Sequence, residues 1–428
     1  MGSLPPPPIR WLGLLLAVSG SAAILGLTLF PTPGQAVFSA RTPLHCLVCG
    51  EHGGADVFLN LLLFTPLATG LRLLGCSWRR VVAISASLSL AVEVLQYYVV
   101  PGRDASLSDL LTNTTGAAIA AGIAPHLGRL LAPDRVLARR LFVGSVALWL
   151  GVLTLSAIAV MPWVPSGRLR NDCTRSFDSP DTFSGTVRSV VLNGVLLPCD
   201  DELPGALPLR ESLSRGEATL DVVALSGRPT GRRTLIHAVR VPRGFLVVLA
   251  QEGRSAAFTV PTLALRFRLY SPILRSPKAF PPREGIPVEL HAGIHDRRMW
   301  ISSSHSGKRR MVEVALSPSH GWSALLPWGI QMGRRLRLAT AFWIGGLILP
   351  AAYWAGFIRN PVRGWAGVAA ALAAGLGVLP SLTGYAPAHW SEWLGGFLGA
   401  ALGWALHWSA AYLQSRCGSP STGAYSSS

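Results

Sequence analysis

The stretch VEVLQYYVVPGRDASLSDLLTN, Val92 to Asn113, places polar and charged side chains between two apolar runs. SASLSLA precedes it and TTGAAIAAGIA follows it, and both flanks are typical of membrane-spanning helices. A charge at membrane depth is costly and is normally kept for function. The residues that need an explanation are Glu93, Gln96, Arg103, Asp104, Asp109 and Asn113.

The composition around this stretch is that of a polytopic membrane protein. Half of the 428 residues are apolar and 14% are charged, and the mean hydropathy is +0.40. A spanning helix needs about 20 apolar residues. We therefore predict eight helices, at residues 11–30, 56–74, 81–100, 109–131, 141–163, 337–358, 365–380 and 392–412. The formal charge of +17 does not indicate nucleic-acid binding, because no nucleic-acid-binding motif organises the basic residues.

The distribution of arginine predicts the orientation. With a cytoplasmic N-terminus, the short cytoplasmic loops and tails carry eleven arginines and the short outer loops carry two, Arg41 and Arg103. Short cytoplasmic loops are normally the ones enriched in Lys and Arg. We expect a multi-pass protein of the inner (cytoplasmic) membrane with both termini in the cytoplasm.

Cysteine usage is consistent with this topology. Four cysteines, Cys46, Cys49, Cys173 and Cys199, fall on the outer side, where disulfides persist. We predict a Cys173–Cys199 disulfide. HCLVCGEH, residues 45 to 52, can be read as a metal motif or as a loop closed by a Cys46–Cys49 disulfide, and we favour the disulfide and assign no metal site.

Residues 164–336 have a different composition and are predicted to form an extracytoplasmic antiparallel β-sandwich. Alternating runs separated by turn residues predict short strands. They are TVRSVVLNGVLL, ATLDVVALS, RTLIHAVRV, GFLVVLAQ, LALRFRLYS, PVELHAGI and RMWISSS. The region carries 24 basic and 14 acidic residues, which is either a solvated arginine-rich surface or a site of attraction for anionic lipid or cell-wall polymer.

The insert resembles concanavalin-like or laminin-G-like jelly-roll domains, most visibly in PVELHAGIHDRRMWISSS. Members that hydrolyse glycans carry closely spaced carboxylates on one strand, because a general acid and a nucleophile flank one bond. No such spacing occurs here. Glycan hydrolysis is therefore not expected, while carbohydrate binding and a structural role both stay open.

The few acidic residues of the membrane half recur at helical spacing. Asp56 and Asn60 are four residues apart, which places them on one face of a helix. Asp109 and Asn113 repeat this spacing, and Gly116 follows, where it allows close helix approach. In addition, Glu93 and Gln96 are three apart, with Arg103 in the loop that follows.

DVFLNLLLFTPLATGL (56–71) and VEVLQYYVVPGRDASLSDLLTNTTGAAIA (92–120) resemble the two signature segments of VanZ-like membrane proteins, over roughly residues 10–130. The resemblance implies a bacterial membrane protein from a family named for reduced susceptibility to a lipid-tailed glycopeptide antibiotic. The positions that match the family pattern are Asp56, Asn60, Pro66, Glu93, Gln96, Arg103, Asp109, Asn113 and Gly116.

A second pattern lies near the C-terminus. SEWLGGFLGAALG (391–403) aligns with SDLLTNTTGAAIA (108–120), with Glu392 in the place of Asp109. We interpret it as a degenerate repeat; the alternative is chance alignment of Gly- and Ala-rich helices. The expected domains are a five-helix membrane domain (1–163), the sandwich (164–336) inserted between the fifth and sixth helices, a three-helix segment (337–412) and a disordered tail (413–428).

Three functions are compatible with these residues. The first, which we favour, is binding of a lipid headgroup or lipid-linked cell-wall intermediate, with phosphate on Arg103 and the other polar residues around it. The second is an enzyme that modifies such a lipid, with Glu93 or Asp109 as general base. The third is a structural knot of Arg103 with the carboxylates, in a scaffold that displays a carbohydrate-binding sandwich. No cofactor is expected.

Overall fold

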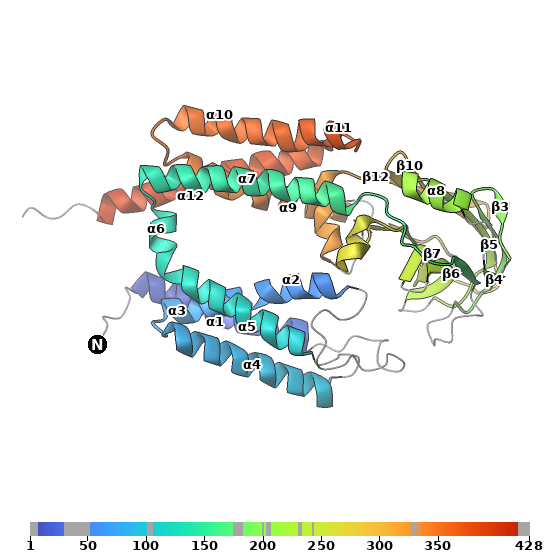
Figure 1. Cartoon of the computed structure of the whole chain (residues 1–428), viewed down its shortest axis with the longest axis horizontal. Helices are drawn as coiled ribbons and strands as arrows, with labels where there is room; N and C mark the ends of the chain where they lie inside the picture. The colour runs from blue at the N-terminus through green and yellow to red at the C-terminus, as the bar shows by residue number, and fades with distance from the viewer. Residues whose placement is uncertain are drawn as a thin grey trace, which may run out of the picture. The chain divides into compact units, whose positions relative to one another are not determined.

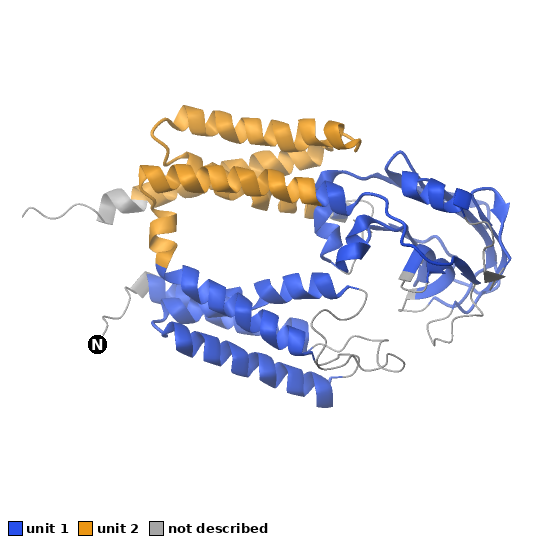
Figure 2. Ribbon diagram, viewed as in Figure 1, with its two compact units in different colours: residues 1–125, 156–336 blue, residues 126–155, 337–428 orange. Residues whose placement is uncertain are grey.

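The computed structural model describes residues 7–29, 52–100, 106–173, 183–198, 201–202, 207–229, 233–241, 244–326, 330–331 and 334–417. The chain divides into two units (Figure 2). Unit 1 comprises residues 1–125 and 156–336, and unit 2 comprises residues 126–155 and 337–428. Helix α7 therefore begins in unit 2 and ends in unit 1.

Five helices form the N-terminal part of unit 1 (Figure 1). Their bounds are α1 Pro7–Thr28, α2 Gly53–Leu63, α3 Thr65–Leu73, α4 Trp78–Tyr98 and α5 Leu107–Ile123. α1 and α3 approach closely, because a Cβ added at Gly70 would lie 2.5 Å from the backbone nitrogen of Ala17. Small residues at a helix contact are how membrane helices gain packing without a hydrophobic driving force. Phe64 and Ile24 are fully buried in the resulting core.

Six of the described helices are long and apolar enough to cross a membrane. They are Ile9–Thr28, Gly53–Leu73, Trp78–Tyr98, Arg135–Ala159, Leu336–Ala355 and Pro361–Thr383. The chain is thus a multi-pass membrane protein, but eight spans are not confirmed. The predicted spans at 109–131 and 392–412 are absent from this set. The first corresponds to the 17-residue helix α5, which is followed by a 3-10 turn and a short helix. The second corresponds to α12, in which glycine, tryptophan and histidine residues lower the mean hydropathy.

Residues between the fourth and fifth of these helices form two β-sheets, as predicted. The seven-stranded sheet has the order β13-β9-β8-β7-β6-β1-β4, and the six-stranded sheet has the order β12-β11-β10-β5-β2-β3. Pairing is antiparallel except between β13 and β9. Buried and exposed residues alternate along β5 and along the first part of β10, which is typical of strands with one face on a core.

The strands have the following bounds: β1 Arg170–Cys173, β2 Thr186–Leu192, β3 Val195–Leu196, β4 Asp201–Glu202, β5 Ala218–Leu225, β6 Arg233–Val241, β7 Gly244–Glu252, β8 Ser255–Thr259, β9 Ile273–Ser276, β10 Pro287–His295, β11 Arg298–His305, β12 Lys308–Ala315 and β13 Ile330–Gln331. Tight turns join neighbouring strands. Asp296 and Arg297 both have positive φ, as do Asn193 and Gly194, and two such residues in succession suit the twist of a hairpin.

One predicted strand is wrong, and one helix of this region was not predicted. LALRFRLYS forms a 3-10 helix, Leu263–Phe267, which ends at Arg268 with a φ of 54°. The segment is flanked by Pro261 and Pro272, and prolines lack the N–H that an inner strand donates to its neighbour. In addition, a helix, α8 Leu207–Arg215, lies in the region for which only strands were predicted.

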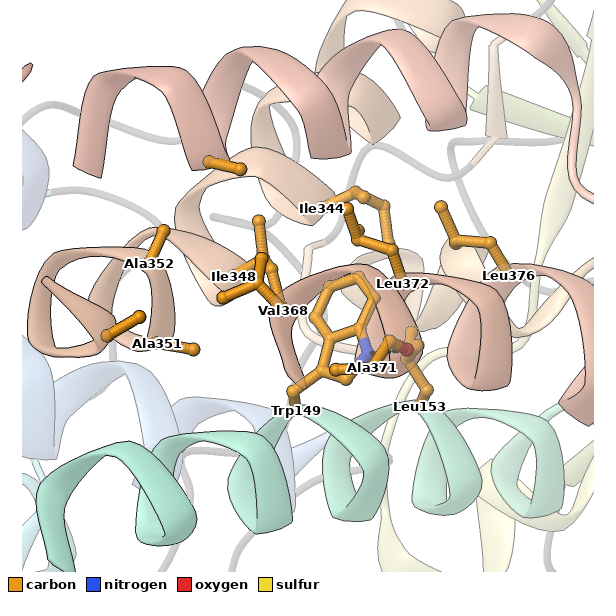
Figure 3. Close-up of a cluster of buried hydrophobic side chains, with 12 residues drawn as sticks. Trp149, Leu153, Ile344, Ile348, Ala351, Ala352, Val368, Ala371, Leu372 and Leu376 are labelled. Atoms are coloured by element: carbon orange, nitrogen blue, oxygen red, sulfur yellow. Dashed lines mark hydrogen bonds between the residues drawn. The ribbon is translucent and has the colours of Figure 1, made fainter. Parts of the chain in front are cut away.

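Unit 2 is a helical bundle with its own apolar core. Its helices are α6 Leu127–Leu131, α7 Arg135–Ala159 up to residue 155, α9 Arg334–Ala355 from residue 337, α10 Pro361–Leu372, the π-helical turn Ala373–Val378, α11 Leu379–Thr383 and α12 Trp390–Cys417. Trp149 of α7 lies beside Leu372 and Ile344 (Figure 3). Its indole N–H donates to the carbonyl of Ala371 at 3.0 Å, so the one polar atom of this buried ring is satisfied.

The predicted disulfides fall partly outside the described residues. Cys46, Cys49 and Cys199 lie there, as does most of HCLVCGEH. Cys173 ends strand β1.

No group of three or more His, Cys, Asp or Glu residues in the described part of the chain is placed to hold a metal ion.

Candidate functional site

The two Asp-x-x-x-Asn pairs meet between α2 and α5. The side-chain amide of Asn60 donates to Oδ1 of Asp109 at 2.8 Å. α5 begins directly after Ser106, whose hydroxyl accepts from the backbone N–H of Ser108. Ser106 is thus the N-cap, and Asp109 lies in the first turn, where a negative charge is favourable. Residues 49 positions apart in the chain are brought into one contact.

Glu93 of α4 is joined to the start of α5. Its side chain is 7% exposed, and Oε2 accepts the backbone N–H of Ser106 at 2.7 Å. Asp109 is close enough to interact electrostatically with Glu93. The two carboxylates therefore belong to one site.

The side-chain amides of Gln96 and Asn113 each donate one hydrogen bond through the nitrogen. Gln96 Nε2 donates to the carbonyl of Thr28 at 3.0 Å, and Asn113 Nδ2 donates to the hydroxyl of Ser89 at 3.0 Å. Their oxygens, Oε1 of Gln96 and Oδ1 of Asn113, are buried and have no hydrogen-bond partner among the described residues. Such groups are uncommon in folded proteins, so these two oxygens are open acceptors for a donor outside the described residues.

Two buried serines of α4 extend this site and were not predicted. Ser85 and Ser89 are fully buried. With Glu93 and Gln96 they make the spacing four, four and three, so all four residues lie on one face of α4. Ser85 Oγ has no hydrogen-bond partner among the described residues. The spacing is visible in the sequence, but serine is common in spanning helices and carried no signal by itself.

The remaining predicted residues have the following places. Asp56 is an exposed residue in the first turn of α2, and Pro66 lies at the start of α3. Gly116 packs on α2, since an added Cβ would lie 2.0 Å from the carbonyl oxygen of Leu61. Glu392 is buried in α12 and belongs to unit 2, whereas the others belong to unit 1. Arg103 lies outside the described residues.

The described atoms of this site accept hydrogen bonds more than they donate them. Two carboxylates and the free oxygens of Gln96 and Asn113 all accept, and both amide nitrogens are already engaged. A guanidinium, an ammonium group or a set of hydroxyls offers the matching donors. Arg103 is only three residues before Ser106 in the chain, so its guanidinium, with five N–H groups, is the cationic donor nearest to this site in sequence.

Comparison with known proteins gives one match. Residues 18–130 match the model of the VanZ/LLP1 family. This range contains α2 to α5 and all the predicted membrane-site residues except Glu392. No curated protein and no solved structure matches the chain, and no identification of the sandwich as concanavalin-like or laminin-G-like is supported. The chain is therefore a multi-pass membrane protein whose residues 18–130 are similar to VanZ/LLP1 proteins.

Proposed function

We propose that the polar site of α2, α4 and α5 binds the headgroup of a membrane lipid or of a lipid-linked cell-wall intermediate in the outer leaflet. Arg103 takes the phosphate through its planar set of donors. Glu93, Asp109 and Gln96 then hold the guanidinium, and the two asparagines bind polar groups beside it. The family match over the same helices supports a shared role for this segment.

The observation that carries the proposal is the pair of buried, unpartnered oxygens on Gln96 and Asn113. An unpaired buried acceptor costs roughly 1–3 kcal/mol. A headgroup hydroxyl or ammonium group that donates to these oxygens offsets this cost when the lipid is bound, which supports a binding role.

A pair of lipids with the same tail tests the proposal. Purified full-length protein in detergent is titrated with a polyprenyl phosphate and with the corresponding polyprenol, which lacks the phosphate. We expect saturable binding of the phosphate form. Arg103→Ala should weaken this binding by tenfold or more, since a charge-assisted pair is worth on the order of 1.5–3 kcal/mol. Glu93→Gln should weaken it as well.

Two variants at exposed positions control for the change of charge. Arg79→Ala removes an exposed arginine at the opposite end of α4, and Asp134→Asn changes a carboxylate that caps α7. Both should bind as the wild type does. Equal affinity of wild type and Arg103→Ala, or equal binding of the two lipids, would contradict the proposal. Chemical conversion of the phosphate lipid would instead support the enzyme, with Glu93 or Asp109 as base.

The resemblance to VanZ-like proteins extends the proposal to antibiotic susceptibility. A bacterium that produces the chain should be less susceptible to a lipid-tailed glycopeptide antibiotic than one that lacks it. Production of Arg103→Ala at the same level should remove this protection. Protection that persists in the variant would separate the phenotype from the polar site.

A further inference from the structure

A groove of about 1040 Å³ lies on the six-stranded sheet of the sandwich. Helix α8 and the turn at Asn193–Gly194 form one wall, and the outward-facing side chains of β11 and β12 form the other. Pockets that enclose drug-sized molecules measure roughly 300–1,000 Å³. The groove is therefore large enough for a ligand of several linked rings.

The floor of the groove carries an indole ring laid against the sheet. Trp300 on β11 pairs with Gly293 on β10 and with Glu313 on β12. A Cβ added at Gly293 would lie 2.3 Å from Cζ2 and 2.7 Å from Cη2 of Trp300. The ring thus occupies the space that any other residue at 293 would fill. Trp300 is partly exposed, so part of its ring remains open to the groove.

Charged groups of both signs surround this ring. Arg298 Nη1 and Glu313 Oε1 are 3.1 Å apart. His295 Nε2 is 3.3 Å from Asp296 Oδ2, and His295 Nδ1 is 3.9 Å from Glu217 Oε1. These side chains are between 40% and 82% exposed. The groove therefore offers both donors and acceptors at its rim, on either side of an apolar surface.

We propose that this groove binds a saccharide chain. A sugar ring has a flat apolar face that suits an aromatic ring and a rim of hydroxyls, each of which donates and accepts. An apolar floor with a few placed polar groups is the general pattern of a small-molecule site. Glu217 and Glu313 are each paired with a basic neighbour, which holds them as acceptors, and no bond cleavage is assigned to them.

Titration of full-length protein with soluble oligosaccharides tests the proposal. Cellotetraose, chitotetraose and tetragalacturonic acid represent neutral, N-acetylated and anionic chains, and calorimetry measures their affinity. We expect saturable binding of at least one. Trp300→Ala should weaken that binding by about tenfold or more, as truncation of a central aromatic anchor does. Trp300→Phe keeps a smaller aromatic ring, so its affinity should lie between those of the wild type and Trp300→Ala.

A second variant in the rim guards against loss of folding. Glu313→Gln removes the charge next to Trp300 and should also weaken binding, while Arg228→Ala breaks a comparable exposed ion pair with Glu284 elsewhere in the sandwich and should not. Failure of all three tetrasaccharides to bind the wild type would overturn the proposal. So would undiminished binding by folded Trp300→Ala and Glu313→Gln. Binding of the polyprenyl phosphate should be unchanged in these variants, which keeps this test separate from that of the membrane site.

Discussion

His237 lies buried inside the seven-stranded sheet. Its Cα pairs with Cys173 of β1 and Leu249 of β7. The residue is fully buried, and neither ring nitrogen has a partner among the described residues. Burial disfavours the charged imidazolium and lowers the pKa of His237 to about 4. The native sandwich therefore holds this histidine neutral throughout the mildly acidic range.

This burial predicts an acid-sensitive sandwich. Between about pH 6.5 and 4 the unfolded chain binds a proton at His237 that the native chain does not, so the free energy of unfolding falls as the pH falls. The total loss is on the order of 3 kcal/mol. Thermal melting of full-length protein, followed by the β-sheet circular dichroism signal, measures it. The variant His237→Leu should flatten this part of the pH profile, and an unchanged slope would exclude His237 as the cause.

Single residues of the membrane site were predictable where spacing carried the information. Asp56 and Asn60 have the same four-residue spacing as Asp109 and Asn113. The structure joins Asn60 of the first pair to Asp109 of the second by a hydrogen bond. Ser106 followed by Asp109 is also a recognisable helix start. The contact of Gln96 with the carbonyl of Thr28 was not predictable, because it depends on how α1 packs and a backbone carbonyl has no sequence signature.

Glycine sets the distance between α2 and α5, and glycine does the same in unit 2. The Cβ added at Gly116 meets the Leu61 carbonyl oxygen at 2.0 Å, and one added at Gly399 of α12 meets the Gly345 carbonyl oxygen of α9 at 2.2 Å. Gly116 is seven residues after Asp109, and Gly399 is seven after Glu392. The aligned segments thus share a glycine at which two helix backbones touch, which is consistent with a degenerate repeat.

Substitution of these glycines predicts a position-dependent effect within one helix. Gly116→Ala should destabilise the protein by about 1–3 kcal/mol, because the methyl group forces α2 and α5 apart. Gly122 of the same helix has open space around it, so Gly122→Ala should change stability by less than about 0.5 kcal/mol. Melting temperatures in detergent compare the two. Equal effects would mean that the contact with Leu61 does not limit packing.

Strands with strict alternation were predictable, and irregular elements were not. β5, β6, β7, β10 and β11 follow the predicted runs. β12, which begins Lys-Arg-Arg, lacks alternation because its first four residues are exposed. LALRFRLYS has the alternation but not the strand, because its local backbone bends at Arg268. The alternation of apolar residues in a sequence shows which face of a segment is apolar. It does not show whether a neighbouring strand is present to pair with that segment.

Arginine bias predicts the orientation of the whole chain. The sandwich should lie outside the cytoplasm and both chain ends inside. Alkaline phosphatase, which is active only outside the reducing cytoplasm, should be active when inserted after Thr230 in the sandwich and inactive when fused after Ser428. Green fluorescent protein, fused at the same two positions, should give the reverse result. Activity of the phosphatase at the C-terminus would contradict the predicted topology.

The number of spans was less predictable than their existence. Runs of apolar residues located six helices of spanning length. The run at 109–131 was counted as a span because its apolar residues continue past Ile123, yet the chain there changes to a 3-10 turn, Ala124–His126, and a short helix. Pro125 lies in that turn, and proline cannot continue a helix without loss of a hydrogen bond.

The two sheets of the sandwich end in strands that resist further pairing. In the described part of the chain, β3, β4 and β13 at three of the sheet ends have two residues each, and β12 at the fourth begins Lys308–Arg309–Arg310. Short strands and basic side chains at a sheet edge prevent edge-to-edge association between molecules. Growth of neighbouring sandwiches into fibrils by strand addition is therefore disfavoured.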